Sequence, residues 1–95
     1  MSAISLEIEL LERLRAQPDL AGAGLSIAPG WFGDGLVIMS GRHCRGHWRV
    51  VDGRFEWTPP GQQGVRESAS TVDDAVRCTL RLFLASLPLH TTHKA

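Results

Sequence analysis

The chain has 95 residues, of which 43% are hydrophobic and 21% charged, and ten basic residues balance ten acidic ones. This length and composition are typical of one folded domain and exclude a disordered chain. A net charge of zero excludes a general electrostatic attraction to nucleic acid or to a membrane, so such binding would need a local patch.

The first residues predict neither an export signal nor a membrane span. Residues 1–12 mix Ile and Leu with three glutamates and lack the basic start and continuous apolar core of a signal peptide. No apolar stretch approaches the roughly 20 residues of a membrane-spanning helix. Two cysteines, Cys44 and Cys78, are too few for a disulfide framework. We therefore expect a cytoplasmic protein with reduced thiols.

Residues 3–16 predict the first helix, because apolar residues recur there at three- and four-residue spacing. Glu9 and Arg13 are placed to form an ion pair one turn apart. Pro18 is expected to end the helix, since the residue before a proline avoids helical geometry. The predicted inward stripe comprises Ile4, Ile8, Leu11 and Leu14, broadened by Leu10.

Residues 18–35 are rich in glycine and proline and predict a loop, in which Leu25–Ile27 could form a short edge strand. Trp31 and Phe32 are expected to fold back over the core, with a ligand-contacting loop as the alternative. Residues 35–40 form a short run that contains β-branched residues and is apolar on both faces, which predicts a strand.

Residues 47–58 predict a β-hairpin, since Asp52-Gly53 separates two alternating runs and suits a type I′ turn. This turn pairs Val51 with Arg54 and sets the register of the whole hairpin. The expected dry face carries Trp48, Val50, Phe55 and Trp57, and the wet face carries His47, Arg49, Val51, Arg54, Glu56 and Thr58.

The remaining chain predicts a mobile loop over 61–68 and a helix over 70–87. Ser70 is the expected N-cap, with Asp73 three residues later. Asp73 and Arg77 are spaced for an ion pair, and Pro88 is expected to stop the helix. The predicted inward stripe comprises Val72, Val76, Thr79, Leu80, Phe83 and Leu87.

These elements predict an α+β two-layer sandwich over residues 1–88, followed by a disordered polar tail over 89–95. An antiparallel sheet of three or four strands would carry the N- and C-terminal helices on one face, in the order α-β-β-β-α. The other face would be open. It should expose either Leu36 and Ile38 or Val37 and Met39, near Val51, as an apolar patch bordered by arginines. Such patches commonly mark protein interfaces, so a homodimer is expected.

The segment 42–54 is the richest in chemically active side chains. Its candidate binding residues are Arg42, Arg45, His47, Arg49, Val51 and Arg54. Arginine forks bind carboxylates and phosphates, and arginines beside aromatic residues can hold nucleic acid. The alternatives are an anionic protein partner, nucleic acid, or a solvated strand face with one ion pair between Arg49 and Glu56.

Metal binding and catalysis are weakly supported by the same segment. Cys44 and His47 have a spacing that zinc ligands use, but a structural site needs four ligands. In a regular strand His43 and His47 would face one side and Cys44 the other. A cysteine nucleophile would also need an orienting group and an oxyanion site, for which the sequence gives no pattern. We therefore expect no metal, no cofactor, no catalytic residue and no enzyme activity.

The predicted order of elements is similar to that of double-stranded-RNA-binding domains. Where those domains carry basic residues at the start of the last helix, this chain has Asp73 and Asp74. The stretch 70–75 also resembles the sheet-to-helix step of small antitoxin and integrase arm-binding domains. These are likenesses of fold and carry no residue roles. The resulting hypothesis is a non-catalytic protein-interaction or regulatory domain, with nucleic-acid or anion binding at 42–54 as the alternative.

Overall fold

The computed structural model describes residues 3–30, 35–61 and 64–84. The helices and strands of these residues occur in the order α1 (Ala3–Arg15), α2 (Pro18–Gly22), β1 (Leu25–Pro29), β2 (Leu36–Ser40), β3 (His43–Val51), β4 (Arg54–Thr58), β5 (Glu67–Ala69) and α3 (Val72–Leu84).

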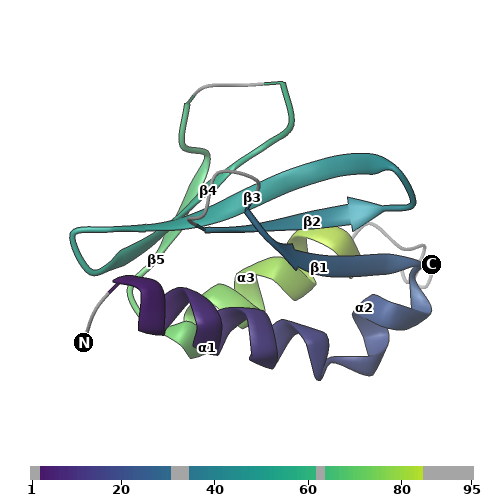
Figure 1. Cartoon of the computed structure of the whole chain (residues 1–95), viewed down its shortest axis with the longest axis horizontal. Helices are drawn as coiled ribbons and strands as arrows, with labels where there is room; N and C mark the ends of the chain where they lie inside the picture. The colour runs from purple at the N-terminus through teal and green to yellow at the C-terminus, as the bar shows by residue number, and fades with distance from the viewer. Residues whose placement is uncertain (1–2, 31–34, 62–63, 85–95) are drawn as a thin grey trace, which may run out of the picture.

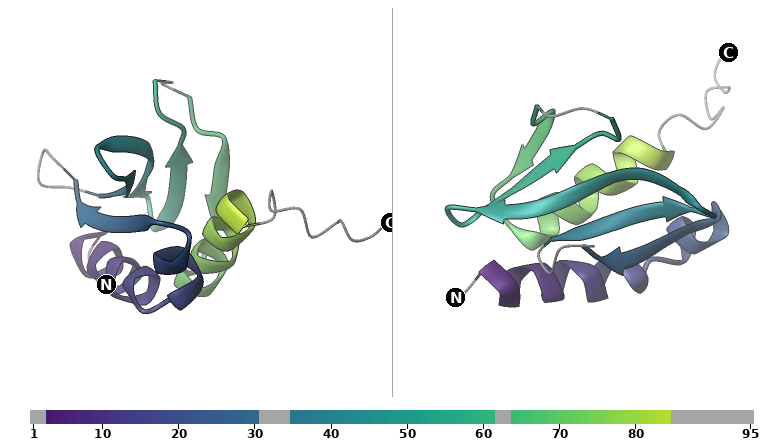
Figure 2. Two further views of the ribbon diagram at one scale, coloured as in Figure 1. Left: turned by 90° about the vertical axis from the view of Figure 1, so that its right-hand side faces the viewer. Right: turned by 45° about the horizontal axis from the view of Figure 1, so that its top comes forward.

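The five strands form one sheet in chain order, and every neighbouring pair is antiparallel. The helices all lie on one side of this sheet (Figure 1). Figure 2 shows α1 under the β1 side of the sheet and α3 under the β4–β5 side. The predicted α+β architecture, with N- and C-terminal helices packed on an antiparallel sheet, is confirmed.

The β3–β4 hairpin has the predicted turn and register. Asp52 and Gly53 have φ angles of 53° and 77°, the pair of positive values that a type I′ turn requires. Val51 lies opposite Arg54, and the pairing continues without a shift to His47 opposite Thr58. The side of the hairpin predicted to be dry packs into the core, where Trp48, Phe55 and Trp57 are buried.

Trp48 lies at the centre of the core and has no exposed surface. Its indole N–H donates to the Thr79 hydroxyl of α3 at 2.9 Å, and that hydroxyl donates to the Ala75 carbonyl at 2.8 Å. The Trp57 ring lies 5.5 Å from the Trp48 ring, centre to centre. Thr79 therefore satisfies the one polar atom of the buried indole, as such groups require.

Trp57 depends on a glycine in the neighbouring strand. Its ring packs against Gly46, where a Cβ atom would overlap the indole, and Gly46 has a φ of 134°. The same ring meets Phe83 of α3 edge-on, with the centres 5.7 Å apart. Gly46 thus provides the space that lets the indole pack between this strand and Phe83 of α3.

Two elements were not predicted. The short helix α2 lies in the expected loop 18–35. Pro18 is tolerated there because it occupies the first turn of the helix, where a backbone N–H is not needed. Strand β5 begins at the end of the expected mobile loop 61–68, where Glu67 pairs with Trp57. Strand β1, expected only as an option, is present and makes the sheet five-stranded.

The predicted inward stripe of α1 is wrong at its first two positions. Ile4 and Ile8 are 63% and 49% exposed, whereas Leu10 and Leu14 are buried. The third buried position is Glu7, only 8% exposed. Residues 7, 10 and 14 share one helix face at the same spacing as the predicted stripe, so the helix is rotated about its axis relative to the expectation.

Glu7 is buried because its carboxylate accepts two backbone hydrogen bonds. Oε1 accepts from the Gly35 N–H at 2.9 Å, and Oε2 accepts from the Val50 N–H at 3.0 Å. The β2–β3 register begins with Leu36 opposite Trp48, so Val50 lies beyond it and its amide needs another acceptor. Glu7 therefore ties α1 to the start of β2 and to β3.

The local ion pairs predicted within each helix are replaced by other partners. Arg13 pairs with Asp73, which joins α1 to α3, rather than with Glu9. Arg77 pairs with Asp74 at 2.8 Å rather than with Asp73. Thr71 is the N-cap of α3, since its hydroxyl accepts from the Asp74 N–H at 3.0 Å, so the assignment of Ser70 was wrong by one residue.

Some predictions concern residues outside the described ranges. These are the placement of Trp31 and Phe32, the last turn of the helix predicted over 70–87, its stop at Pro88 and the tail 89–95.

Changing Thr79 to Val should destabilise the fold by about 1–3 kcal/mol, because the buried Trp48 N–H would lose its acceptor. Urea unfolding followed by tryptophan fluorescence measures this loss. Thr79→Ser is the matched control, since it keeps the hydroxyl. Equal stability of the Val variant and the wild type would contradict this account of the core.

Changing Glu7 to Ala should cost about 2 kcal/mol or more, because two partly buried N–H groups would lose their acceptor. Thermal unfolding of Glu7→Ala, Glu7→Gln and Glu12→Ala tests this. Glu12 is exposed on the same helix and should tolerate alanine, and Gln, which keeps one oxygen, should fall between the two. A Glu7→Ala variant as stable as Glu12→Ala would show that the two hydrogen bonds contribute nothing.

Candidate functional site

The face of the sheet away from the helices is the candidate site. Along β3, Trp48 and Val50 point toward the helices, so His47, Arg49 and Val51 point to the opposite face. Figure 1 shows the described helices on the other side of the sheet. We call the outward residues of β2, β3 and β4 the open sheet face: Val37, Met39, Cys44, His47, Arg49, Val51, Arg54, Glu56 and Thr58.

The apolar part of this face is smaller than expected. Of the two alternatives for β2, Leu36 and Ile38 belong to the core, which leaves Val37 and Met39 on the open side. Val37 is only 5% exposed, although it is not on the helix side. Met39 and Val51 are half-buried. The expectation of an exposed apolar patch here was therefore wrong, and a narrow, partly covered apolar strip takes its place.

The exposed large apolar side chains lie elsewhere. Among the described residues they are Ile4 and Ile8 on α1 and Val65 in the segment between β4 and β5. Single exposed apolar residues are common on protein surfaces and need no explanation on their own.

The six candidate binding residues do not form one cluster. Arg42 lies in the turn before β3, whereas Arg54 follows the turn at the other end of that strand. Strand β3 has nine residues, so these turns are separated by roughly 30 Å at about 3.3 Å per residue. One small anion cannot contact both arginines.

Arg45 leaves the open sheet face altogether. The β2–β3 register pairs Ile38 with Gly46 and Met39 with Cys44, so Arg45 is the extra residue of a β-bulge. Its guanidinium carbon lies 5.8 Å from the centre of the Phe83 ring, which belongs to α3. Arg45 is therefore a cation–π partner of the helix layer.

The bulge also changes which side Cys44 faces. Cys44 lies opposite Met39, and His47 lies opposite Val37, so both are on the open sheet face. The prediction that Cys44 and His47 face opposite sides was wrong, because it assumed a regular strand. The Cys44 thiol donates to the Gly46 carbonyl at 3.7 Å.

Three of the candidates remain together on the open sheet face, namely His47, Arg49 and Val51 of β3. Arg54 joins them from β4 and donates to the Ser68 hydroxyl of β5 at 3.1 Å. Arg49 lies opposite Glu56 in the register, so one basic and one acidic side chain face each other across the hairpin. These side chains form a mixed polar rim beside the strip of Val37, Met39 and Val51.

The acidic start of α3 is used within the molecule. The Arg13 guanidinium hydrogen-bonded to Asp73 lowers the pKa of that carboxyl, and Asp74 is paired with Arg77. At the other end of the helix layer, Arg81 donates to Glu67 at 3.1 Å and to the Cys78 thiol at 3.5 Å.

The two cysteines are free thiols in different surroundings. Cys44 is half-buried on the open sheet face, and Cys78 is buried on α3 with 4% of its surface exposed. Burial raises the pKa of the Cys78 thiol. The Arg81 guanidinium acts to lower it and the Glu67 carboxylate to raise it, and burial is the largest effect. Within the described ranges, no three or more His, Cys, Asp or Glu side chains are grouped as metal ligands.

Two residues with specific roles were missed by sequence reasoning. Glu7 could have been found, because it shares the spacing of Leu10 and Leu14. The contact of Arg45 with Phe83 depends on a bulge that the sequence marks only through Gly46.

The described residues form an α+β domain whose helices cover one face of the sheet and leave the other face without a helix. None of the described helices has the length and apolar character needed to cross a membrane. No protein family model, no curated protein and no solved structure matches the chain.

Cys44 should react with a thiol reagent much faster than Cys78 in the folded protein. Cys78 is buried and its raised pKa lowers the thiolate fraction, and the thiolate is the reactive form. Iodoacetamide labelling at pH 8, followed by peptide mass spectrometry, measures both rates. Equal rates in the folded protein, or faster labelling of Cys78, would contradict the burial described above; in urea the two rates should converge.

Proposed function

We propose that this protein is a non-catalytic, cytoplasmic interaction domain that binds another protein through the open sheet face and forms a homodimer by the same face. The observation that carries the proposal is the arrangement of this face. The half-buried Met39 and Val51, which lie beside the buried Val37, are flanked by His47, Arg49 and Arg54. Protein interfaces commonly combine an apolar centre with a polar rim, and arginine is enriched in them.

A protein partner fits this surface better than a nucleic acid does. A phosphate backbone is best held by several cations that act together. Here the arginines of 42–54 are divided between two turns and two faces, with Arg45 against Phe83 and Arg54 on Ser68. Glu56, opposite Arg49, would also repel phosphate.

An anionic partner remains the second candidate because charge is unevenly divided between the layers. In the described ranges the helices carry six acidic residues and four arginines, whereas the strands and connecting segments carry five arginines and three acidic residues. The strands and connecting segments are therefore the more basic part of a neutral molecule. Arg49 and Arg54 direct part of that charge to the open sheet face, which an acidic protein surface or nucleic acid could approach.

The non-catalytic assignment rests on the chemistry around Cys44 and His47. These are the candidate nucleophile and base on the open sheet face. The thiol makes its contact with the Gly46 carbonyl, which neither activates it nor positions a base.

Sedimentation velocity over a range of concentrations tests the homodimer. The wild-type protein should dimerise, and Val51→Glu should weaken the dimer by tenfold or more, about 1.4 kcal/mol, because it places a charge in the strip. Ile8→Glu is the matched control, since it adds the same charge at an exposed apolar residue on the other layer. A wild-type monomer at every concentration, or a dimer weakened by Ile8→Glu instead, would refute association through this face.

Heparin chromatography separates the two candidates. An interaction domain for protein partners should elute at low salt, and changing Arg49 and Arg54 together to Ala should not alter its elution. Salt-dependent retention that falls in the double variant would favour the anion-binding function instead.

A further inference from the structure

Three side chains with metal-binding donor atoms lie together at one end of the open sheet face. Met39 of β2 lies directly opposite Cys44 of β3, and His47 lies opposite Val37, two residues before Met39. The three side chains are half-buried, so they are partly shielded from water and still accessible to an ion. They offer a thioether, a thiol and an imidazole on one side of two neighbouring strands.

The β-bulge in β3 is the reason that these groups meet. In a regular strand Cys44 and His47, which are three residues apart, would point to opposite faces. Because Arg45 is the extra residue of the bulge, only two positions of the facing strand β2 separate Cys44 from His47. The bulge therefore brings together two donor groups that a regular strand would hold apart.

Strand geometry places the three donor groups within reach of one ion. Residues directly opposite each other on antiparallel strands have Cβ atoms roughly 5 Å apart, and diagonal neighbours are roughly 7–8 Å apart. Met39 and Cys44 are a direct pair, and His47 is a diagonal neighbour of Met39. Sulfur and imidazole nitrogen lie about 2.0–2.3 Å from a bound metal such as zinc. The long side chains of methionine and histidine cover the remaining distance.

The Cys44 thiol is available as a ligand. It donates to the Gly46 carbonyl at 3.7 Å, a long contact made by a weak donor. Replacing this contact with a metal–sulfur bond therefore costs little. Gly46 directly precedes His47, so the thiol already contacts the part of β3 that carries the imidazole.

The donor set favours Cu(I) over other common metals. Thiolate and thioether sulfurs are the soft ligands that select Cu(I), and imidazole also binds copper. A structural zinc site takes four ligands, which are usually cysteine, histidine or carboxylate. In the part of the chain that the structure describes, no three His, Cys, Asp or Glu side chains are grouped in this way. Calcium and magnesium require oxygen ligands, which this set does not supply.

We propose that Met39, Cys44 and His47 form a Cu(I) site on the open sheet face. On binding, the Cys44 thiol releases its proton to the solvent and forms a copper–thiolate bond, with no change in the oxidation state of either partner. The Met39 thioether and one ring nitrogen of His47 complete the ligand set. One Cu(I) and one thiolate have no net charge, which lowers the cost of placing the ion in a half-buried site.

The test is an anaerobic titration of the full chain with Cu(I), supplied as its acetonitrile complex, in competition with the coloured chelator bicinchoninate. The wild type should remove one Cu(I) per chain from the chelator. In a ¹H–¹³C spectrum of methionine-labelled protein, the ε-methyl resonance of Met39 should shift as copper binds. Zn(II) at the same concentration should leave that resonance unchanged, because thioether is not a zinc ligand of choice.

Variants of the three ligands and one matched control identify the site. Cys44→Ser should abolish binding, and Met39→Leu and His47→Gln should each weaken it tenfold or more. His43→Gln is the control, because His43 is an exposed histidine one residue before Cys44 that pairs with Ser40. It should bind Cu(I) as the wild type does. Thermal unfolding of each variant confirms that it is folded.

The proposal is overturned if the wild type takes no Cu(I) from the chelator, or if copper leaves the Met39 methyl resonance unchanged. It is also overturned if Cys44→Ser binds as tightly as the wild type, or if His43→Gln loses binding. Val51→Glu separates this test from the homodimer. Since all three ligands belong to one chain, this variant should bind Cu(I) as the wild type does, and loss of copper there would contradict the site.

Discussion

The packing of Trp48 between the sheet and α3 is the constraint on which the other parts of the structure depend. A fully buried indole needs an acceptor for its N–H, and Thr79 supplies it from the middle of α3. This hydrogen bond fixes where α3 lies along β3. Trp57 then packs between Trp48 and Phe83, which fixes the tilt of the same helix. The outward side of the hairpin is left as the open sheet face because its inward side is committed to these contacts.

The features that could be predicted from the sequence are those set by neighbours in the chain. The Asp52-Gly53 turn determines the register of β3 and β4, because a two-residue turn allows one pairing only. The alternation of Trp48 and Val50 with polar residues then determines the buried face. These are local effects, and tertiary contacts did not override them.

The features that could not be predicted depend on tertiary contacts. The spacing of apolar residues in α1 allowed Ile4 and Ile8 to face the core, but Glu7 is placed there because Val50 and Gly35 present unpaired N–H groups. Arg13 had a partner one turn away, yet it binds Asp73 on α3. In both cases a hydrogen-bond partner distant in sequence determined the outcome, and periodicity carries no information about it.

One extra residue in β3 explains why the candidate site was only partly predictable. A regular strand would place Cys44 on the core side and keep Arg45 with Arg49 on the outside. The bulge reverses this, so Arg45 contacts Phe83 and Cys44 joins His47. Gly46 is required beside the bulge because the Trp57 ring occupies the place of its side chain. The burial of Trp57 and the composition of the open sheet face are thus consequences of the same glycine.

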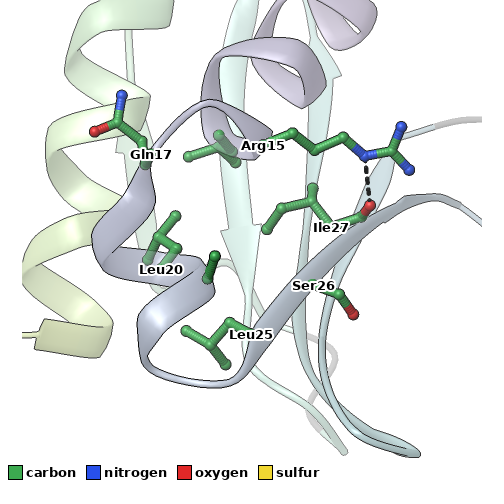
Figure 3. A pocket seen from close by; sticks show the side chains of 8 residues that line it. Arg15, Gln17, Leu20, Leu25, Ser26 and Ile27 are labelled. Atoms are coloured by element: carbon green, nitrogen blue, oxygen red, sulfur yellow. Dashed lines mark hydrogen bonds between the residues drawn. The ribbon is translucent and has the colours of Figure 1, made fainter.

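Among the described residues β1 is an edge strand, and its backbone indicates why association is expected through the face of the sheet and not through this edge. The Gly30 N–H donates to the Gly35 carbonyl, so the backbone groups of Gly30 point toward β2. Because these groups alternate in direction along the strand, those of Pro29 and Ile27 point outward, away from β2. Pro29 has no N–H to offer there, and the Ile27 carbonyl is occupied by Arg15 (Figure 3). Proline and charged side chains on an edge strand are established means of preventing strand addition.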